Sequence, residues 1–308
     1  MTRWLVTGAA GQLGSDLQRL LAGADVTAID LPELDLTDGP AVADFVRNWA
    51  AGGSAAGGSG PGHPLVVVNA AAWTNVDGAE EHEDTAHRVN AEVPGYLAAA
   101  GATAGATMIH ISTDYVFAGD ATVPYEVDAP VAPRSAYGRT KAAGERAVLD
   151  PATGSGAPAY VVRTAWVYGE TGTNFVKTMV RLERERETVS VVDDQQGSPT
   201  WSRHLAAGLI ELAGSNAPAG IYHCTGGGHT TWYGFTQAIF EELGADPARV
   251  LPTTTAAFPR PAPRPAYSVL SDAAWRAAGL PPMPLWRDAL REAFALPGDP
   301  WRPAGWTR

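Results

Sequence analysis

A tyrosine and a lysine stand four positions apart in the segment AYGRTKAAGE, residues 136–145. Residues at i and i+4 lie on one face of a helix, so Tyr137 and Lys141 are expected to be neighbours. An ammonium group beside a phenol stabilises the phenolate and lowers the tyrosine pKa from its usual value of about 10. The pair therefore predicts a proton donor or acceptor that works at neutral pH, with a plain solvated helix face as the alternative.

Lysine is otherwise scarce in this chain. Lys141 and Lys177 are the two lysines among 22 basic residues, and the others are arginines. A compact ammonium can reach both a ribose hydroxyl and a phenol, whereas a broad planar guanidinium fits such a corner poorly. We hypothesise that this chemistry explains a lysine at position 141.

A glycine motif, TGAAGQLG at residues 7–14, follows the first apolar run. Its glycines, Gly8, Gly11 and Gly14, allow a tight turn and close backbone approach to a pyrophosphate at the N-terminus of the next helix. An ordinary glycine-rich turn is the alternative. Asp30 ends the second predicted strand, where a carboxylate can bind the adenosine ribose hydroxyls and favours NADH over NADPH because it repels a 2′-phosphate.

A second acidic position follows shortly after. Asp35 and Leu36 could lie along the adenine edge of a bound dinucleotide. Asp35 could equally be a helix N-terminal aspartate, since Thr37 and Asp38 follow it. The sequence leaves both roles open.

The segment HISTDYVF, residues 110–117, ends a predicted strand on the side where open α/β sheets bind ligands. Thr113 in this segment could hydrogen-bond a substrate carbonyl oxygen alongside Tyr137. The alternative is a strand-end threonine followed by a capping aspartate.

These residues require a scaffold, and the chain predicts one by alternating short apolar runs with helical patterns. Runs of this kind, without polar alternation, are typical of buried parallel strands, and strand–helix–strand repetition predicts a Rossmann-type, doubly wound parallel sheet with helices on both faces. The expected strands are residues 4–8, 25–30, 65–70, 107–113 and 159–166, and the expected helices are residues 12–22, 40–50 and 83–100.

The rhythm loosens after about residue 170, where short strands are expected at 188–192 and 220–224. An amphipathic helix is indicated by the spacing of five apolar residues: Trp232, Phe235, Ile239, Phe240 and Leu243. We expect an NAD(P)-binding Rossmann domain over residues 1–168 and a smaller α/β domain, mainly for substrate binding, over 169–308, although the chain could cross between them. The Gly/Ser-rich insert at 50–63 is expected to be a mobile surface loop.

Composition restricts the partners. The 308 residues carry a formal net charge of −11, which argues against nucleic acid or an anionic membrane surface as a partner. The single cysteine, Cys224, cannot form an internal disulfide and fits a reducing compartment. Because no apolar run has the length of a signal peptide or a membrane span, we expect a soluble cytoplasmic protein.

Taken together and in this order, the motifs resemble the extended short-chain dehydrogenase/reductase family and, within it, the dTDP-4-dehydrorhamnose reductases. The resemblance runs from about residue 3 to residue 295 and includes both predicted domains. The segments that carry it are GQLG, NAAAWTNVDGAE (69–80), STDYVF (112–117), AYGRTKAAGE (136–145), RTAWVYG (163–169), NFVKTM (174–179), DDQQGSPT (193–200) and TTWYGF (230–235).

The resemblance implies roles for individual residues. Tyr137 would donate the proton, Lys141 would tune it and bind the nicotinamide ribose, and Thr113 would hold the sugar oxygen. Glycine spacing and resemblance together give a cofactor set for NADPH or NADH: Gly8, Gly11, Gln12, Leu13, Gly14, Asp30, Asp35, Leu36, Ala70, Ala71, Ala72, Tyr137 and Lys141. The implied dTDP-sugar site comprises Thr113, Asp114 and Trp166, with Asn174, Lys177 and Arg264 at its nucleotide end.

Two points depart from the family. The insert at 50–63 is longer than usual, but it falls between a helix and a strand, where insertion is cheap. Some family members are described as metal-linked homodimers that use acidic residues matching Asp16 and either Asp193 or Asp194. A carboxylate on a helix is more often simply solvated, so no metal ligand is predicted, and Mg²⁺ and a homodimer stay open.

The implied reaction is NAD(P)H-dependent reduction of the C4 keto group of dTDP-4-dehydro-L-rhamnose. A related reductase that makes a deoxysugar for a secondary metabolite is an alternative. Dehydratases of the superfamily use an Asp-Glu pair where this chain has Asp114-Tyr115, and no proton shuttle for an epimerase is found. The non-catalytic regulatory subunit of methionine adenosyltransferase also resembles the family, but Thr113, Tyr137 and Lys141 together favour an enzyme.

Overall fold

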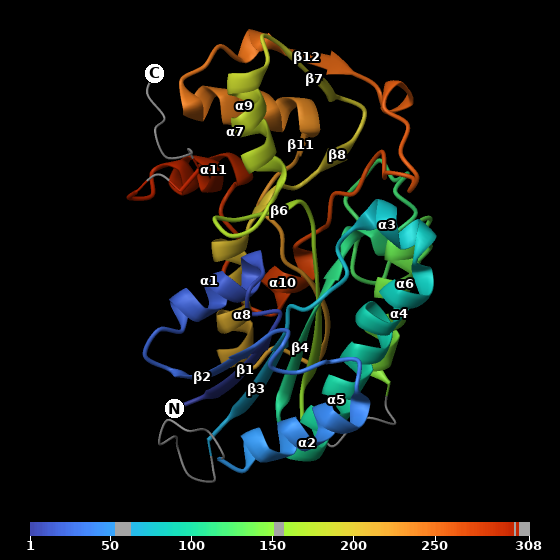
Figure 1. The fold of residues 1–308 in the computed structure, drawn as a ribbon, viewed down its shortest axis with the longest axis vertical. Coiled ribbons are helices and arrows are strands. Elements are labelled where there is room, and N and C mark those ends of the chain that lie inside the picture. Colours follow the sequence, from blue (N-terminus) through green and yellow to red (C-terminus); the bar gives the residue numbers. More distant parts are fainter. Residues whose placement is uncertain (53–62, 151–156, 299, 302–308) are drawn as a thin grey trace.

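The computed structural model describes residues 1–52, 63–150, 157–298 and 300–301. A parallel sheet with helices on both sides forms the larger part of the molecule, and a smaller part lies beyond the carboxyl ends of the strands (Figure 1). The insert predicted at 50–63 falls mostly outside the described residues. Among the helices of the described ranges, none is long and apolar enough to cross a membrane.

The central sheet has six strands in the order β10-β5-β4-β3-β1-β2, and every pairing is parallel. Its strands are β1 (Arg3–Thr7), β2 (Asp25–Ile29), β3 (Leu65–Asn69), β4 (Thr107–Thr113), β5 (Ala159–Thr164) and β10 (Gly220–His223). All five strands predicted before residue 170 are present. The strand predicted at 220–224 also exists, but it extends the edge of this sheet next to β5.

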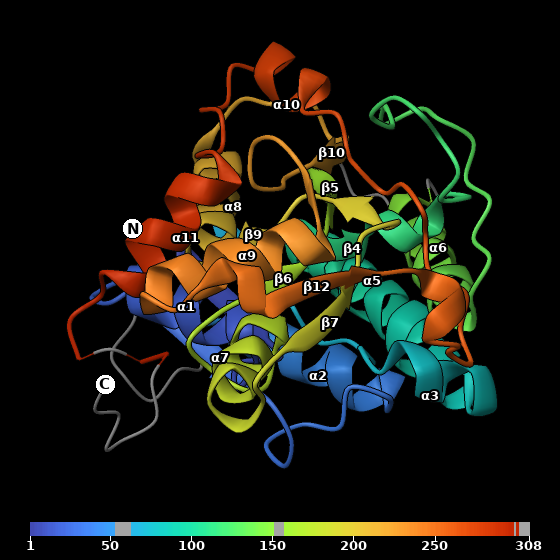
Figure 2. The ribbon, with the colours of Figure 1, turned by 90° about the horizontal axis from the view of Figure 1, so that it is seen from above.

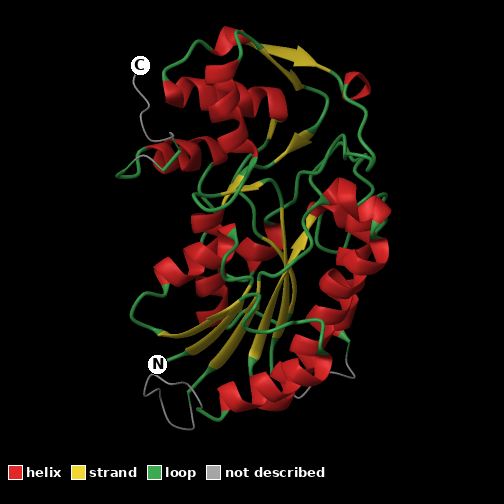
Figure 3. Cartoon of the chain, viewed as in Figure 1, coloured by secondary structure: helices red, strands yellow, loops and turns green. Residues whose placement is uncertain are grey.

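Apolar side chains of successive strand residues point to opposite faces of the sheet, and both faces are covered. Val66 and Val68 of β3 pack into one hydrophobic cluster, whereas Val67 packs into another. The first face is covered by α1 (Gln12–Leu20), α8 (Ser202–Gly214) and α10 (Ala273–Ala277), and the second by α2 (Gly39–Ala50), α5 (Val93–Ala104) and α6 (Ala136–Leu149) (Figure 3). The predicted doubly wound α/β fold class is confirmed.

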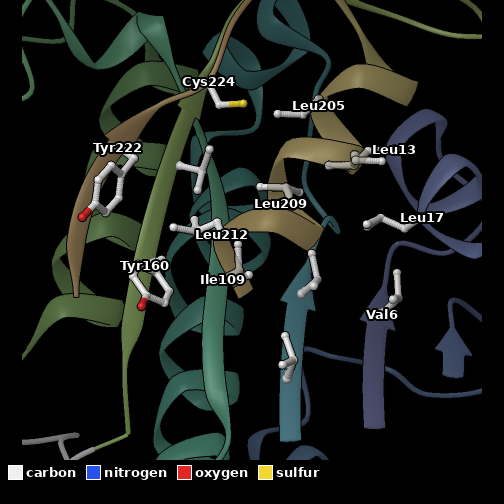
Figure 4. Packing of buried hydrophobic residues seen from close by; sticks show 14 of the residues in the cluster. Val6, Leu13, Leu17, Ile109, Tyr160, Leu205, Leu209, Leu212, Tyr222 and Cys224 are labelled. Atoms are coloured by element: carbon white, nitrogen blue, oxygen red, sulfur yellow. The ribbon is translucent and has the colours of Figure 1, made fainter. Parts of the chain in front are cut away.

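The first face joins distant segments of the chain. Leu13 and Leu17 of α1 pack against Leu205 and Leu209 of α8 above Val6 of β1 (Figure 4). Each fully buried leucine of this kind stabilises the fold by roughly 1.5–3 kcal/mol. The helix that follows the glycine motif is therefore held in place by a helix from the second half of the chain.

One predicted helix is interrupted. In place of a continuous helix over 83–100, the structure has α4 (Glu83–His87), a π-helical turn η1 (Arg88–Glu92) and then α5. Proline lacks an amide hydrogen, and its ring clashes with the carbonyl four residues before it. Pro94 therefore accounts for the local widening of the helix, since π turns absorb such a mismatch.

The smaller part contains α7 (Phe175–Glu185), α9 (Trp232–Leu243) and α11 (Trp286–Phe294), with α9 lying between the other two (Figure 2). As predicted, Phe235, Ile239, Phe240 and Leu243 form the buried face of α9. Three strand pairs complete this part: β7 (Val189–Val192) with β12 (Val250–Thr253), β8 (Gln196–Gly197) with β11 (Thr230–Thr231), and β6 (Val167–Tyr168) with β9 (Thr200–Trp201).

Between these pieces lie short elements. In the described part of the chain they are α3 (Val76–Glu81) and the 3₁₀ turns η2 (Asp114–Val116), η4 (Pro247–Arg249) and η5 (Thr255–Ala257). From the smaller part the chain returns to the sheet as α8 and β10, and then crosses back.

Candidate active site

A cavity of about 800 Å³ opens at the carboxyl ends of β1, β3, β4 and β5, bordered on its far side by residues of the smaller part. The chain leaves β1 for β2 on one side and returns to β3 on the other, so the strand order reverses here. Open α/β sheets bind ligands at such a point. Twelve of the thirteen predicted cofactor residues line the cavity: Gly8, Gly11, Gln12, Leu13, Asp30, Asp35, Leu36, Ala70, Ala71, Ala72, Tyr137 and Lys141.

The glycine loop is shaped for close backbone contact. Gly8 has a φ of +69°, and a Cβ there would lie 2.6 Å from the Ala70 carbonyl carbon and from Ala71 N. A Cβ on Gly14 would lie 2.2 Å from Gly8 O, so Gly14 packs the helix against the loop and does not line the cavity. The prediction of Gly14 as a direct cofactor contact is not reproduced by this geometry.

The first turn of α1 carries no side-chain cap. Its N-cap residue, Gly11, offers no capping oxygen, whereas Asp38 caps α2 and Ser135 caps α6. The leading N–H groups of α1 are thus left without a side-chain acceptor among the described residues, at the edge of the cavity. Helix N-termini of this kind bind phosphate groups, so these residues fit a dinucleotide pyrophosphate.

The two acidic cofactor candidates already hold backbone groups. Asp30 accepts hydrogen bonds from Ala10 N at 2.9 Å and from Leu31 N at 3.0 Å. Asp35 accepts from Thr37 N at 2.9 Å and from Thr37 Oγ1 at 2.7 Å, and these bonds lower the pKa of its carboxyl. Asp35 therefore forms a turn before α2, whose N-cap is Asp38, and it also lines the cavity; its contact with an adenine stays a prediction.

Tyr137 and Lys141 lie in the first two turns of α6. The N-cap side chain of Ser135 accepts from Gly138 N at 3.1 Å and starts the helix one residue before Tyr137. Lys141 is 2% exposed, and its Nζ donates to Ile111 O at 2.6 Å. Burial lowers the pKa of Lys141 to about 8, and the negative charge of Glu145 acts in the opposite direction.

The expected effect of Lys141 on Tyr137 is wrong for this structure. Burial raises the pKa of Tyr137 to about 12, a hydrogen bond with Thr113 opposes the rise, and the charge of Asp114 adds to it. The lysine has no part in the shift because its ammonium end is turned toward the backbone of β4. Tyr137 is consequently a protonated phenol at neutral pH.

The end of β4 brings three further groups to the cavity. Thr113 Oγ1 donates to Asp114 Oδ1 at 2.9 Å, and the ring of Tyr115 meets that of Tyr137 edge-on with centroids 5.6 Å apart. Burial raises the pKa of Asp114 to about 6, and the hydrogen bond from Thr113 opposes the rise. Asp114 Oδ2 is buried without a hydrogen-bond partner among the described residues, so it is a ready acceptor for a ligand hydroxyl.

Two stacked indoles form the opposite wall. Trp166 has a φ of +49°. The centroid of its indole ring lies 3.5 Å from that of Trp232, and the two ring planes differ by 7°. Both line the cavity, and Phe175 contacts the Trp232 ring. Trp166 was predicted, whereas Trp232 was recognised as a helix residue only. Its place in the segment TTWYGF, which carries the family resemblance, is the signal that could have identified it.

Of the three weaker substrate candidates, one lines the cavity and two do not. Asn174 lines the cavity, and its Nδ2 donates to Gln12 Oε1 at 3.0 Å. Lys177 points away, donating to the carbonyls of Glu170 and Gly172. Arg264 pairs with Asp77 at 2.9 Å and does not line the cavity.

The acidic residues considered for a metal are engaged elsewhere. Asp16 is buried and accepts hydrogen bonds from Ser202 Oγ and from Arg19, so it is not the solvated carboxylate that the sequence suggested. Asp193 accepts from Thr231, and Asp194 accepts from Thr255. Within the described residues, no three His, Cys, Asp or Glu side chains are grouped as a metal site would need.

A glycine loop against an uncapped helix, next to a tyrosine and a lysine on one helix and a threonine at a strand end, defines a dinucleotide-dependent oxidoreductase of the extended short-chain type. Comparison with known proteins gives the family. The family model described as RmlD substrate binding domain matches residues 2–296.

Relatives of known name agree. The chain is 51% identical to a dTDP-4-dehydrorhamnose reductase of Streptomyces griseus over 98% of this chain and 96% of that protein. It is 45% identical to a dTDP-4-keto-6-deoxy-D-glucose reductase of Streptomyces niveus over 96% of this chain and 97% of that protein. A crystal structure of the Bacillus anthracis dTDP-4-dehydrorhamnose reductase in complex with NADP superimposes with a TM-score of 0.86 at 36% identity, over 95% of this chain and 98% of that one. The chain belongs to the dTDP-4-dehydrorhamnose reductase family, which confirms the resemblance found in the sequence.

Proposed function

We propose that this protein reduces the C4 keto group of dTDP-4-dehydro-L-rhamnose to dTDP-L-rhamnose with NADPH or NADH. The observation that carries the proposal is the meeting of Thr113, Asp114 and Tyr137 at one end of a cavity whose other end is the glycine loop. The names of the relatives supply the substrate, and the NADP complex of the Bacillus anthracis relative supports the choice of cofactor.

The dinucleotide would lie along the glycine loop, Asp30, Asp35 and the alanines at 70–72, and when bound it supplies the hydride. Reduction of a ketone to an alcohol needs one hydride at carbon and one proton at oxygen. The proton comes from Tyr137, which is a phenol at neutral pH and therefore already in its donor form. Thr113 can donate a second hydrogen bond once its hydroxyl turns from Asp114 Oδ1 to the C4 oxygen, so stabilisation grows as charge develops there.

Substrate positioning falls to the walls of the cavity. Asp114 Oδ2 can accept from a sugar hydroxyl, because it has no protein donor within the described part of the chain. The flat face of Trp166, supported by Trp232, can pack against the sugar or the base. Lys177 and Arg264 could reach the nucleotide only by leaving their present partners, so we give them a lesser role.

The proposal also includes the roles of the two domains, the location in the cell and the oligomeric state. Residues 1–168 would hold the dinucleotide and 169–308 mainly the sugar nucleotide, with α8 and β10 returning to the dinucleotide side. Both ligands are multiply charged phosphate compounds that cross bilayers poorly, which favours a cytoplasmic location. We include a homodimer, and sedimentation of the purified protein tests it.

A second function has a specific observation in its favour. The relative from Streptomyces niveus is named for a different 4-keto sugar at 45% identity, so a reductase of a related deoxysugar is the main competitor. A steady-state assay distinguishes the two candidate substrates. NAD(P)H should be consumed only when dTDP-4-dehydrorhamnose is added, and faster than with other dTDP-4-keto-6-deoxyhexoses. Consumption with none of these sugars would favour a non-catalytic binding protein and end the proposal.

A further inference from the structure

A line of buried polar side chains runs beneath the cavity from β1 to α6. Thr7 Oγ1 donates to Asn69 Oδ1 at 2.7 Å, and Asn69 Nδ2 lies 3.1 Å from His110 Nδ1. The other ring nitrogen of His110, Nε2, lies 3.5 Å from Lys141 Nζ. His110 is fully buried, and the proposed reaction gives it no role.

One backbone amide fixes the orientation of Asn69. Ala71 N donates to Asn69 Oδ1 at 3.1 Å. A backbone N–H can only donate, so the side-chain atom that it meets must be the amide oxygen and not the nitrogen. The NH₂ group of Asn69 therefore faces His110.

The orientation of Asn69 fixes the tautomer of His110 in turn. Because Asn69 Nδ2 donates, His110 Nδ1 must accept and carries no hydrogen. Burial lowers the pKa of His110 well below its usual value, with the charge of Lys141 acting in the same direction, so the ring is neutral. A neutral ring without a hydrogen on Nδ1 carries it on Nε2, the atom that faces Lys141.

Lys141 consequently faces a donor. Its Nζ already donates to Ile111 O at 2.6 Å. A neutral amine could donate to Ile111 and accept from His110 Nε2–H through its lone pair, whereas an ammonium has no lone pair and would meet that hydrogen with one of its own. At 3.5 Å, the long limit of a hydrogen bond, the contact fits two donors that face each other, an unfavourable arrangement that loss of one Nζ proton would relieve.

The other charges around Lys141 do not reverse this preference. Glu145, one turn further along α6, favours the ammonium, but both of its oxygens are held by Arg163, at 2.8 and 2.7 Å. Tyr137, one turn earlier, is an uncharged phenol at neutral pH. On the η1 side, the α6 surface meets the uncharged Asn90, which donates to Thr140. The net result for Lys141 is a pKa lowered to about 8.

We propose that His110, oriented by Asn69, is a positioning residue that destabilises the ammonium form of Lys141 and so makes this lysine a readier proton source for the active-site tyrosine. The proposal rests on the proposed function in one respect, namely that Lys141 serves Tyr137. After the phenol has given its proton to the sugar oxygen, a proton passes from Nζ to the phenolate through an intervening hydroxyl or water. The amine left behind accepts the His110 hydrogen bond until solvent returns the proton.

The scarcity of lysine makes a direct test practical. Protein made with ¹³C,¹⁵N-lysine gives signals from Lys141 and Lys177 alone, and Lys177→Arg assigns them. The Lys141 signal should titrate near pH 8 in the parent protein. In His110→Gln it should titrate at least one pH unit higher, a tenfold or greater change in the acid dissociation constant, because the new amide oxygen can accept from an ammonium.

Matched variants isolate the cause. His223→Gln makes the same change at another buried histidine, on β10, whose contacts are Ser271 O and Arg163, and it should leave the Lys141 titration in place. Asn69→Leu keeps a similar size but removes the donor to Nδ1 without adding a charge, so the ring hydrogen is free to move to Nδ1 and the titration should again rise. The ¹⁵N shifts of the histidine rings report which nitrogen carries the hydrogen in the parent protein.

Two outcomes would overturn the proposal. One is a Lys141 titration that stays unchanged in a folded His110→Gln protein, and the other is a parent His110 with its hydrogen on Nδ1. If His110→Gln does not fold, the ring tautomer of the parent and the titration of Asn69→Leu still decide. These measurements need neither sugar nor dinucleotide, so failure of the proposed reductase activity would be seen separately.

Discussion

Asn174 Nδ2 donates a 3.0 Å hydrogen bond to Gln12 Oε1, so the residue that caps α7 also holds the residue that follows the glycine loop. The same side chain accepts from Lys177 N at 3.0 Å as the N-cap of α7 and donates to Gly169 O at 2.7 Å. One asparagine thus links the glycine-loop side of the cavity to α7 of the smaller part.

Replacing this asparagine tests the link. Asn174→Ala is expected to cost about 1 kcal/mol in unfolding free energy for the lost cap and to raise the dinucleotide Kd roughly fivefold, because Gln12 loses its partner. Urea unfolding and fluorescence titration measure the two effects. Asp38→Ala removes a comparable cap from α2 without touching Gln12, so it should lower stability alone. Equal effects of both variants on Kd would contradict the link.

Tyr137→Phe tests the proton donor. The hydroxyl matters mainly in the transition state, so kcat should fall roughly 10²- to 10⁴-fold while dinucleotide binding stays nearly intact. Steady-state kinetics and a binding titration provide the two numbers. A phenylalanine variant of near-normal rate would remove Tyr137 from the donor role.

The raised pKa of Asp114 predicts that its carboxyl lowers the unfolding free energy at neutral pH. Its pKa is raised to about 6 in the folded protein from 3.8, so below pH 4 both states are protonated and no penalty exists. Between about pH 4 and pH 6 the unfolded chain ionises this carboxyl while the folded state keeps it protonated, so stability falls across that range and levels off above pH 6. Asp114→Asn should therefore be more stable than the parent by roughly 1–3 kcal/mol at pH 7, with the difference vanishing below pH 4. Urea unfolding at both pH values checks the sign; a variant less stable at pH 7 would contradict it.

The buried ion pair between Arg163 and Glu145 should stabilise the fold much more than the exposed ion pair between Arg139 and Glu83. Both guanidinium bonds are short, at 2.8 and 2.7 Å, and the two side chains are 1% and 5% exposed. Arg163→Met leaves a buried carboxylate without its charge partner and should cost roughly 3–5 kcal/mol. Arg139→Met breaks the exposed pair with Glu83 and should cost less than about 1 kcal/mol. Similar losses in unfolding free energy for the two variants would refute the contrast.

Cofactor choice can be tested at Asp30. The Asp30→Asn variant can still accept from the Ala10 amide but removes the charge that would repel a 2′-phosphate. The ratio of kcat/KM with NADPH to that with NADH should rise roughly tenfold, about 1.4 kcal/mol. A proportional change with both cofactors would show that the carboxylate shapes the loop without selecting the phosphate.

The sequence predicted the sheet well because parallel strands buried on both faces are continuous apolar runs, as in LVVVN at 65–69. The strand at 220–224 was expected in the smaller domain, but β10 pairs with β5 in the central sheet. Its local sequence gives no sign of this partner. Strand pairing is a long-range property. The π turn before Pro94 was also missed, because apolar periodicity continues through it.

The site was predicted as a set of residues more accurately than as a set of contacts. Helical spacing correctly placed Tyr137 and Lys141 on α6, but spacing cannot say where the end of a long side chain goes, and Nζ turned toward Ile111 O. Asp16 failed for a related reason: whether a helix carboxylate is solvated depends on a helix more than 180 positions away. The cofactor contacts proposed for the lining residues stay predictions until a complex is measured.

The bond between Asp16 and Ser202 bears on the order of events during synthesis. Helix α1 packs against α8 and is hydrogen-bonded to it through Asp16 and Ser202. Strand β5 pairs with β10 at its outer edge, so residues up to His223 complete the packing around the glycine loop and the sheet. A nascent chain that has reached only residue 168 contains every glycine of the motif at 7–14 and the Tyr137–Lys141 pair, yet it still lacks the α8 residues that pack against α1. We therefore expect the glycine loop to gain its full packing only after 223 of the 308 residues have been made, and residues 1–168 to fold poorly when expressed without the rest.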